Sequence, residues 1–489
     1  MNKWRYWPVV VVAVLTLALL VLSLGVPIDP DMGWHLANGS YILEHLRLPP
    51  GDIYSWTMPG YPWVPHEWGS DVIMAALNQL GGLWAVTILF ALVVAAAFYV
   101  VSGAVPISRI TRLFVAIVGL LISWTVVGVR PQMITVLGIA VVLYLLFRWQ
   151  ANRQVRWLWW LPGVFLVWAN LHGGFPAGLG LVVLFGVAEL ARHILSAKSR
   201  RRDKTLLTTA EFRQLAGWWG LAVVATFINP NTWRVYWELY QTFVDRDVLN
   251  RILEWLPVTL TSIGSYNMAL MVALLVGLLI VNRGRFDTTK LIMVVAVLIF
   301  SLTSWRHVPL FALTAMVLLA EQMEHYFGDS LEKQLSTWLG ISCLVIVVFL
   351  AGAWQIFRIG HVIASPATYG EVYRYPYAAV QYLKAHPTDS ARMFNEYGWG
   401  GYLIWQMPEQ KVFIDGRMAI WRHPDFNVFD DLSDVTGVDA QAGLDVLERW
   451  DIDLVLINSN RPINKFLYAS PDTWSLKYRD KIAVVWERI

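Results

Sequence analysis

Long apolar runs separated by shorter polar segments make up the chain as far as residue 358. A membrane-spanning helix needs about 20 apolar residues, and most of these runs approach that length. The runs at 157–169 and 214–228 are shorter, which fits tilted or broken spans. The pattern predicts about eleven transmembrane helices, over residues 8–26, 84–104, 111–129, 131–147, 157–169, 176–195, 214–228, 266–282, 290–304, 307–321 and 337–357.

The pattern changes near residue 359, where apolar and charged positions become mixed. Their periods predict helices near residues 375–384 and 440–450, and strands over residues 392–396, 411–414, 453–457 and 482–486. We therefore predict an α-helical polytopic membrane protein with two domains. Residues 1–358 form the transmembrane domain, with a long first outer loop at 27–83, and residues 359–489 form a small extracytoplasmic α/β domain.

Composition supports this class of protein. Of the 489 residues 57% are hydrophobic and 15% are charged, against roughly a quarter charged in ordinary globular domains. This excludes a soluble enzyme and a nucleic-acid-binding domain. The 27 Trp residues fit a membrane protein, because Trp favours the membrane–water interface. The net charge of +3 is too small to indicate a partner.

Lys and Arg are distributed unequally between alternate loops. The N-terminus and the even-numbered loops hold 18 of them, whereas the odd-numbered loops hold 6. Positively charged loops stay in the cytoplasm. This predicts a plasma (inner) membrane protein with a cytoplasmic N-terminus, a retained first span and an extracytoplasmic C-terminal domain. The basic run at 199–204 is then a cytoplasmic topology anchor.

The predicted spans contain almost no ionisable residues, which argues against an ion or proton transporter. Polar chemistry is instead expected at the outer face. Asp29 and Asp31 follow the first span, and one of them can act as a general base. Together, or with His35 or Glu67, they can alternatively hold a divalent metal. A third interpretation makes Asp31 only the N-cap of an amphipathic helix that ends near Leu46.

Further candidates lie in the other outer segments. Arg130, Arg306 and His307 are cations suited to the phosphate of a lipid, and Arg matches phosphate oxygens well. Turn formation and interfacial anchoring are the alternative roles for residues of this kind. The candidate substrate-binding residues are His35, His66, Glu67, Arg130, His172, Arg306, His307, Trp399 and Arg417.

The first loop resembles a pattern found in bacterial membrane proteins grouped with the GT-C glycosyltransferase superfamily. That superfamily includes protein mannosyltransferases, the aminoarabinose transferase of lipid A and oligosaccharyltransferases. This chain has Gly33 where the pattern usually has Trp. The matching positions are Asp29, Asp31, Trp34, His35, Asp52, Ser55, Thr57, Trp63, His66, Glu67 and Trp68, with later matches at 130–132, 170–174, 229–230, 254–255, 306–307, 395–402 and 415–417.

The resemblance implies a membrane glycosyltransferase that takes a sugar from a polyprenyl-phosphate donor at the outer face, with a catalytic Asp in the first outer loop. We favour Asp31 as the base, with Asp29 as the alternative, and Arg130 or Arg306 as the cation that stabilises the leaving phosphate. Metal dependence stays open, as does the acceptor, which is a glycan, a lipid or a protein. The competing functions are a lipid-linked oligosaccharide ligase or polymerase, a flippase or transporter, and a non-catalytic scaffold of envelope assembly.

Overall fold

The computed structural model describes residues 7–27, 29–198, 205–245, 252–259, 263–387 and 392–489. The contacts divide the chain into two compact units. Unit 1 comprises Met1–Gly25, Thr87–Leu239 and Leu249–Phe357, and unit 2 comprises Val26–Val86, Tyr240–Val248 and Arg358–Ile489. Unit 2 therefore contains both the first outer loop and the C-terminal residues. The predicted basic anchor at 199–204 lies outside the described residues.

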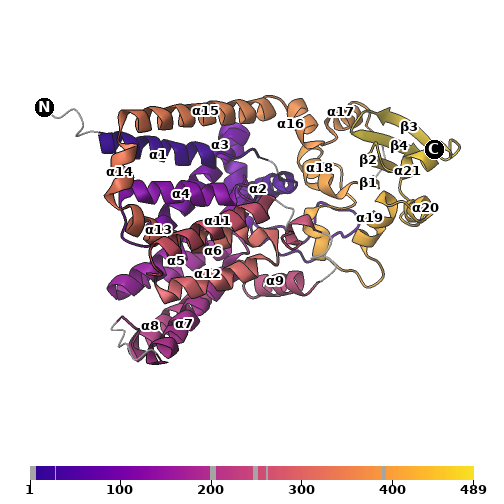
Figure 1. Ribbon diagram of the computed structural model, residues 1–489. Helices are drawn as coiled ribbons and strands as arrows, with labels where there is room; N and C mark the ends of the chain where they lie inside the picture. The colour runs from indigo at the N-terminus through magenta and orange to yellow at the C-terminus, as the bar shows by residue number, and fades with distance from the viewer. Residues whose placement is uncertain (1–6, 28, 199–204, 246–251, 260–262, 388–391) are drawn as a thin grey trace. The chain divides into compact units, whose positions relative to one another are not determined.

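Unit 1 is helical (Figure 1). Each of the predicted apolar runs coincides with a helix. Three helices, α3, α9 and α15, contribute residues to both units, and α3 is kinked at Gly81 and Gly82. The helices are α1 (Trp7–Ser23), α3 (Trp68–Ser102), α4 (Arg109–Ser123), α5 (Gln132–Asn152), α6 (Trp160–Leu171), α7 (Phe175–Lys198), α8 (Thr209–Thr226), α9 (Arg234–Val244), α11 (Ile263–Val281), α12 (Thr288–Ser301), α13 (Val308–Phe327), α14 (Asp329–Leu335) and α15 (Trp338–Ile363), with the short turns η2 (Val155–Trp157), η3 (Leu253–Trp255) and η4 (Trp305–His307).

Helix α13 forms the centre of unit 1. It packs on α4, α5, α11 and α12, and nearly every residue from Val308 to Ala320 is buried. Its sequence explains this position, since a helix that is apolar on all sides has no face suited to water. Side-chain caps begin several neighbouring helices: Ser108 caps α4, Thr208 and Glu211 form a capping box at α8, and Asp287 caps α12.

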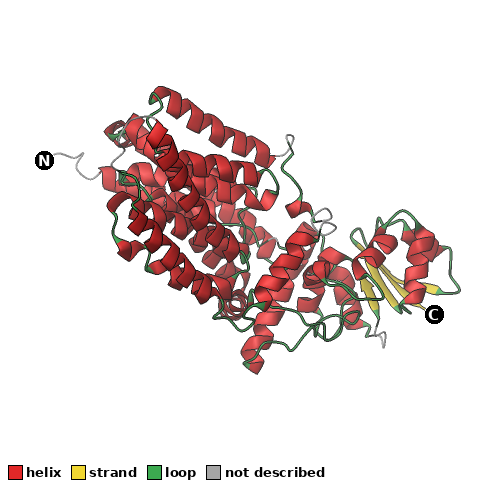
Figure 2. Cartoon of the chain, turned by 90° about the horizontal axis from the view of Figure 1, so that it is seen from below, coloured by secondary structure: helices red, strands yellow, loops and turns green. Residues whose placement is uncertain are grey.

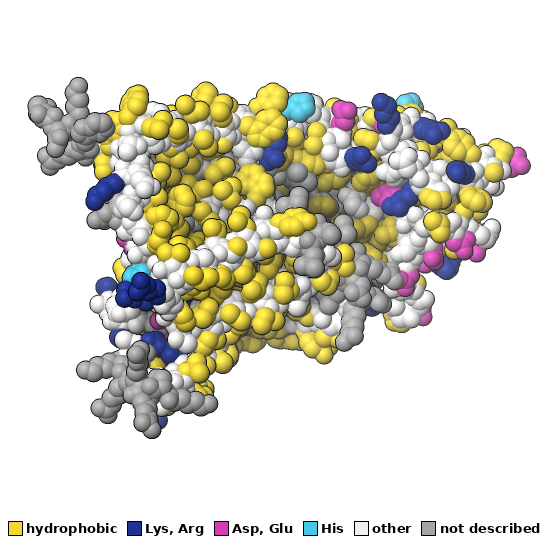
Figure 3. All heavy atoms as spheres, in the orientation of Figure 1, with side chains coloured by type: hydrophobic (Ala, Val, Ile, Leu, Met, Phe, Trp, Pro, Cys, Tyr) yellow, Lys and Arg dark blue, Asp and Glu magenta, His cyan; other side chains and the backbone are white. Residues whose placement is uncertain are grey.

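The outside of unit 1 is apolar. Phe349 and Leu350 on α15 are 71% and 61% exposed, and Figure 3 shows hydrophobic side chains over much of this unit's visible face. Five helices among the described residues, α3, α5, α7, α11 and α15, are long and apolar enough to cross a membrane. A polytopic membrane protein is consistent with both findings, and the count of about eleven spans stays a prediction.

Unit 2 contains a small sheet and short helices (Figure 2). The strand order is β1-β2-β4-β3; β1 and β2 are parallel, and the other pairs are antiparallel. Strand β2 is central and buried, as its apolar run Leu454–Ile457 requires. The elements are α2 (Met32–His45), α16 (Pro366–Tyr373), α17 (Tyr377–Ala385), β1 (Met393–Asn395), η5 (Tyr397–Trp399), α18 (Gly400–Gln406), η6 (Gly416–Ile420), α19 (Val428–Thr436), α20 (Ala440–Arg449), β2 (Leu454–Asn458), α21 (Ile463–Tyr468), β3 (Trp474–Arg479) and β4 (Ala483–Arg488).

One predicted strand is wrong. Residues 411–414 form only a single parallel bridge, in which Val412 pairs with Ser55 of the first loop. The loop segment supplies one partner residue and then turns away, so a ladder does not develop. The predicted helices near 375–384 and 440–450 correspond to α17 and α20, and the predicted helix in the first loop corresponds to α2.

Candidate functional site

Asp29 and Asp31 lie in the turn that leads into α2, within unit 2. The backbone N–H of Asp31 donates to Oδ1 of Asp29 (2.9 Å), and the Tyr375 hydroxyl donates to the carbonyl oxygen of Asp29 (3.3 Å). Asp31 occupies the N-cap position, but its carboxylate makes no capping hydrogen bond. The interpretation of Asp31 as a helix cap is therefore wrong. Its carboxylate is half-buried and is not committed to the backbone of α2.

His35 and Asn38 share a partner that sequence reasoning missed. His35 Nδ1 lies 2.6 Å from Oδ1 of Asp71, and the Asn38 amide donates to Oδ2 of the same carboxylate (2.6 Å). All three residues are buried, and Asp71 lies in the first turn of α3. The sequence feature that could have indicated a shared partner is the i, i+3 spacing of His35 and Asn38, which places both on one face of a helix. Asp71 fixes the orientation of the imidazole ring.

Glu67 contacts the other side of His35. Its carboxylate oxygen lies 3.5 Å from His35 Nε2, and its second oxygen lies 3.9 Å from His66 Nε2. Burial lowers the pKa of His35, but the charge of Asp71, its hydrogen bond and the charge of Glu67 outweigh burial and raise this pKa to about 9. His35 is therefore a cation at neutral pH, placed among carboxylates.

These charges also set the protonation of Asp31. Burial and the neighbouring charge of Asp29 raise the pKa of Asp31 to about 7, although His35 and Trp34 both lower it. A carboxyl group with this pKa is partly ionised at neutral pH and can both accept and release a proton. The structure thus brings together four of the predicted residues: Asp29, Asp31, His35 and Glu67.

A turn from the C-terminal part of unit 2 lies against Asp31. A Cβ atom on Gly416 would lie 1.9 Å from Oδ1 of Asp31, so only glycine permits this approach. The next residue, Arg417, is bound by two carboxylates. Its Nε and Nη2 donate to the two oxygens of Asp415 (2.8 and 2.6 Å), and Nη2 also lies 2.9 Å from Oδ1 of Asp52. The Asp415-Gly416-Arg417 turn is in this way joined to the first loop.

Arg417 and Trp399 are both buried. The Arg417 side chain is 1% exposed, and its guanidinium lies 4.7–5.2 Å from the ring centres of Tyr54, Trp63 and Trp421. Trp399 donates its indole N–H to the carbonyl oxygen of Arg374 (3.0 Å). The structure gives these two predicted substrate-binding residues packing contacts in the interior of unit 2.

A second cluster of predicted residues lies in unit 1. Glu254 binds Arg130 with one carboxylate oxygen and Arg306 with the other, the latter at 2.7 Å from Nε. The Arg306 guanidinium also lies over the ring of Trp255, at 4.7 Å from its centre. Burial raises the pKa of Glu254, but the charges of Arg306 and Arg130 outweigh burial and lower this pKa to about 2. Sequence reasoning noted the Glu254-Trp255 pair but did not connect it with the two arginines.

The two remaining histidines are held by nearby backbone and side chains of unit 1. His307 stacks on Phe300 (ring centres 4.1 Å apart), and its backbone carbonyl oxygen accepts a hydrogen bond from the Ser301 hydroxyl (2.9 Å). His172 Nδ1 accepts a hydrogen bond from the backbone N–H of Gly174 (2.9 Å) and lies 2.7 Å from Thr135 Oγ1. The phosphate-binding role predicted for His307 and the substrate-binding role predicted for His172 stay predictions.

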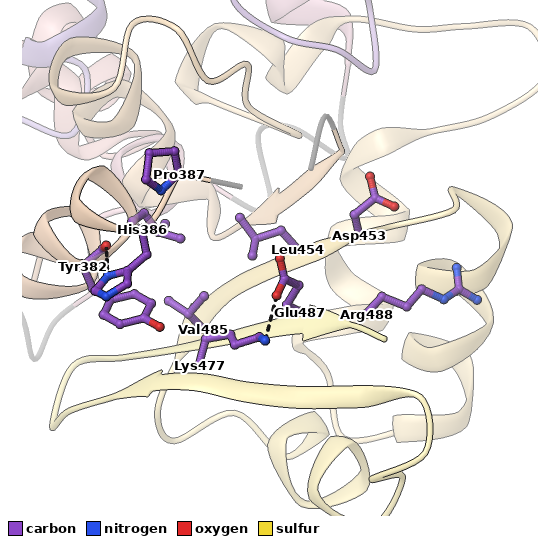
Figure 4. A pocket seen from close by; sticks show the side chains of 10 residues that line it. Tyr382, His386, Pro387, Asp453, Leu454, Lys477, Val485, Glu487 and Arg488 are labelled. Carbon is purple, nitrogen blue, oxygen red and sulfur yellow. Dashed lines mark hydrogen bonds and ion pairs between the residues drawn. The ribbon is translucent and has the colours of Figure 1, made fainter. Parts of the chain in front are cut away.

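A separate cavity of about 600 Å³ lies in unit 2, between α17 and the sheet (Figure 4). None of the predicted site residues lines it. Its wall carries the Tyr382 ring, stacked with His386, and an ion pair between Lys477 and Glu487 (2.9 Å). Among the described residues, no three His, Cys, Asp or Glu side chains are positioned to bind one metal ion, and Asp29 and Asp31 alone do not make up such a set.

The chain matches no protein-family model and no curated protein sequence. Solved structures do resemble it. The Archaeoglobus fulgidus oligosaccharyltransferase tethered to an acceptor peptide has a TM-score of 0.55 at 11% identity, covering 99% of this chain and 74% of that chain. ArnT from Cupriavidus metallidurans, bound to undecaprenyl phosphate, has a TM-score of 0.52 at 12% identity, covering 98% of this chain and 97% of that chain.

The arabinofuranosyltransferase AftD from Mycobacteria gives a TM-score of 0.53 at 12% identity, covering 99% of this chain and 40% of that longer chain. These three proteins are GT-C glycosyltransferases, and each match extends over nearly the whole of this chain. At such low identity the likeness concerns the fold. The comparisons support the GT-C resemblance through the fold, which this chain shares with these three proteins, and leave the first-loop pattern as an expectation.

Proposed function

We propose that the chain is a membrane glycosyltransferase that moves a sugar from a polyprenyl-phosphate-linked donor to an acceptor at the outer face, with Asp31 as general base. One observation carries the proposal. The Asp31 carboxylate begins α2 without capping it, and its pKa of about 7 suits a base at neutral pH. The GT-C fold supports the reaction class, and the neighbours crystallised with undecaprenyl phosphate or an acceptor peptide support the substrate classes.

In the proposed reaction, Asp31 accepts the proton of the acceptor hydroxyl. At the same time, the oxygen of that hydroxyl forms a bond to the anomeric carbon of the sugar. The bond from that carbon to the phosphate oxygen breaks, and the configuration inverts. The polyprenyl phosphate leaves with one additional negative charge, and the cation assigned from the sequence to neutralise it is Arg130 or Arg306. His35, held by Asp71, keeps the pKa of Asp31 from rising further.

We assign positioning roles to the buried partners. Arg417 joins Asp52 to Asp415 and so fixes the turn that lies against Asp31. His66 and Glu67 complete the polar surroundings of His35. No step requires a metal ion. A polyprenyl phosphate carrying a single sugar and one carrying an oligosaccharide are both compatible with these residues, so a ligase or polymerase is the second candidate.

The test is sugar transfer by the full-length protein in lipid nanodiscs, supplied with radiolabelled polyprenyl-phosphate sugars and oligosaccharides. Asp31→Asn is expected to lower the rate about 100-fold or more, because a general base contributes about 10²–10⁴-fold. Asp29→Asn is expected to lower it less, and Asp445→Asn, an exposed carboxylate on α20, serves as the matched control.

Each competing function predicts a different outcome. Rates equal to wild type for both Asp31→Asn and Asp29→Asn would remove the base assignment. Movement of labelled lipid across the membrane without any glycosylated product would indicate a flippase. Product formed only from the oligosaccharide donor would assign the chain to the ligases or polymerases.

A further inference from the structure

Glu254 occupies the position between two arginines that is suited to a phosphate. One carboxylate oxygen binds Arg130 and the other binds Arg306. Guanidinium groups recognise carboxylate and phosphate through the same planar arrangement of N–H donors. The carboxylate of Glu254 is thus an internal counterpart of the anion that the proposed function assigns to these arginines.

The exposure of this cluster distinguishes it from a structural ion pair. The side chains of Arg130, Glu254 and Arg306 are 17%, 38% and 35% exposed. By contrast, Arg417 between its two carboxylates is 1% exposed. Both clusters have one group shared between two oppositely charged partners, but only the Glu254 cluster is accessible to an anion from solvent or from a lipid headgroup.

The surroundings hold the arginines and the backbone of Glu254 independently of its carboxylate. Arg130 Nη2 donates to the carbonyl oxygen of Val126 (3.1 Å), and Arg306 lies over the Trp255 ring. The Ser304 hydroxyl donates to the carbonyl oxygen of Glu254 (2.9 Å). Rotation of the Glu254 side chain alone would therefore withdraw its carboxylate from both guanidinium groups without moving the segment that carries them.

We infer that the Arg130–Glu254–Arg306 cluster is an anion-exchange site, in which Glu254 occupies the phosphate position in the unliganded protein and a lipid phosphate displaces it. This rests on the proposed phosphate role of the arginines and adds a regulatory part to it. Glu254 competes with the phosphate, so it weakens the binding of the polyprenyl phosphate product and promotes its release.

The charges fit this exchange. Two guanidinium groups and one carboxylate leave a net charge of +1, whereas a phosphate monoester carries close to two negative charges at neutral pH. Displacement of Glu254 matches that dianion with two cations. The low pKa of Glu254, about 2, keeps it ionised across the usable pH range, so a competing anion rather than a proton must displace it.

The experiment measures the affinity of the full-length protein in detergent for radiolabelled undecaprenyl phosphate, and separately for inorganic phosphate. Glu254→Gln keeps the shape of the side chain and removes its charge; it is expected to tighten binding of the lipid phosphate about tenfold or more. Glu254→Ala is expected to do the same. Glu321→Gln is the control, because Glu321 is 34% exposed and pairs with Lys290 elsewhere in unit 1.

Arg306→Gln and Arg130→Gln are expected to weaken binding, and thermal unfolding verifies that each variant is folded. Unchanged or weaker binding by both Glu254 variants, with weaker binding by the arginine variants, would overturn the exchange but leave the arginines as phosphate ligands. Unchanged binding by all four variants would overturn the phosphate role itself, while the base role of Asp31 is tested separately by transfer. Tighter binding of inorganic phosphate alone would overturn the lipid assignment.

Discussion

At the scale of single residues, the charge of His35 lowers the pKa of the Asp31 carboxyl group. Burial and the charge of Asp29 raise this pKa. Because a general base acts only when ionised, activity should rise with pH through about 7. His35→Gln removes the cation, so we expect the acidic limb of the kcat/KM profile to move to higher pH. The pH at which activity is half-maximal should then lie above that of the wild type.

The profile separates this electrostatic role from a loss of folding. Misfolding lowers activity equally at every pH, whereas a raised pKa of Asp31 lowers activity at acidic pH and restores it in alkaline buffer. His386→Gln, at the exposed end of α17, is the matched control and should leave the profile unchanged. A His35→Gln profile parallel to wild type would contradict the proposed coupling.

At the residue level, a local pattern located the neighbouring residues, while their functional roles stay predictions. The first loop alone pointed to Asp29, Asp31, His35 and Glu67, which the structure brings together in unit 2. Asp71 was missed because it directly precedes a long apolar run, where a carboxylate is easily assigned to the start of a helix. Its contact with His35 joins residues 36 positions apart, and only the packing of α2 against α3 creates it.

At the scale of elements, α2 owes its position to a close contact with α18. A Cβ atom on Gly33 would lie 2.0 Å from the carbonyl oxygen of Gly401. Gly33, which stands where the pattern usually has Trp, is therefore required by the packing of α2 against α18. Gly33→Ala should force the two helices apart, and overpacking of this kind costs about 1–3 kcal/mol. The loss of stability should appear as a lower apparent Tm of Gly33→Ala than of the wild type, measured in detergent.

Gly398→Ala is the matched control for that substitution. Gly398 belongs to unit 2 and precedes α18, but nothing lies within 4 Å of the position its Cβ would take. We expect its apparent Tm to stay close to wild type. Equal Tm values for wild type and Gly33→Ala would contradict the close contact between α2 and α18.

Elements with a strong period were predictable, and those that depend on a distant partner were not. Eleven apolar runs each became a helix because backbone hydrogen bonds within one segment suffice to form it. The strand expected at 411–414 failed because its neighbour, the first loop, offers a single bridge at Ser55. Strand β3 was not predicted, since its exposed edge position allows polar residues such as Lys477 and Arg479 to interrupt the pattern.

At the scale of the whole molecule, the first outer loop belongs to the same compact unit as the C-terminal residues. The ion pair between Asp52 and Arg417 and the bridge between Ser55 and Val412 join segments more than 350 residues apart. No local period encodes such contacts, so the sequence placed this loop with the transmembrane domain. The division at residue 358 therefore describes the composition of the chain more closely than its packing.

The membrane orientation is the last prediction, and the single cysteine makes it testable. In a Cys343→Ser background, Val438→Cys introduces a thiol at a position that is 92% exposed in unit 2, and Ala151→Cys introduces one at the exposed end of α5. The excess of Lys and Arg in alternate loops requires Val438 outside and Ala151 in the cytoplasm. A membrane-impermeant maleimide should therefore label Val438→Cys in intact cells and Ala151→Cys only after permeabilisation. The reverse labelling would place Asp31 on the cytoplasmic side, where a polyprenyl-phosphate donor at the outer face could not reach it.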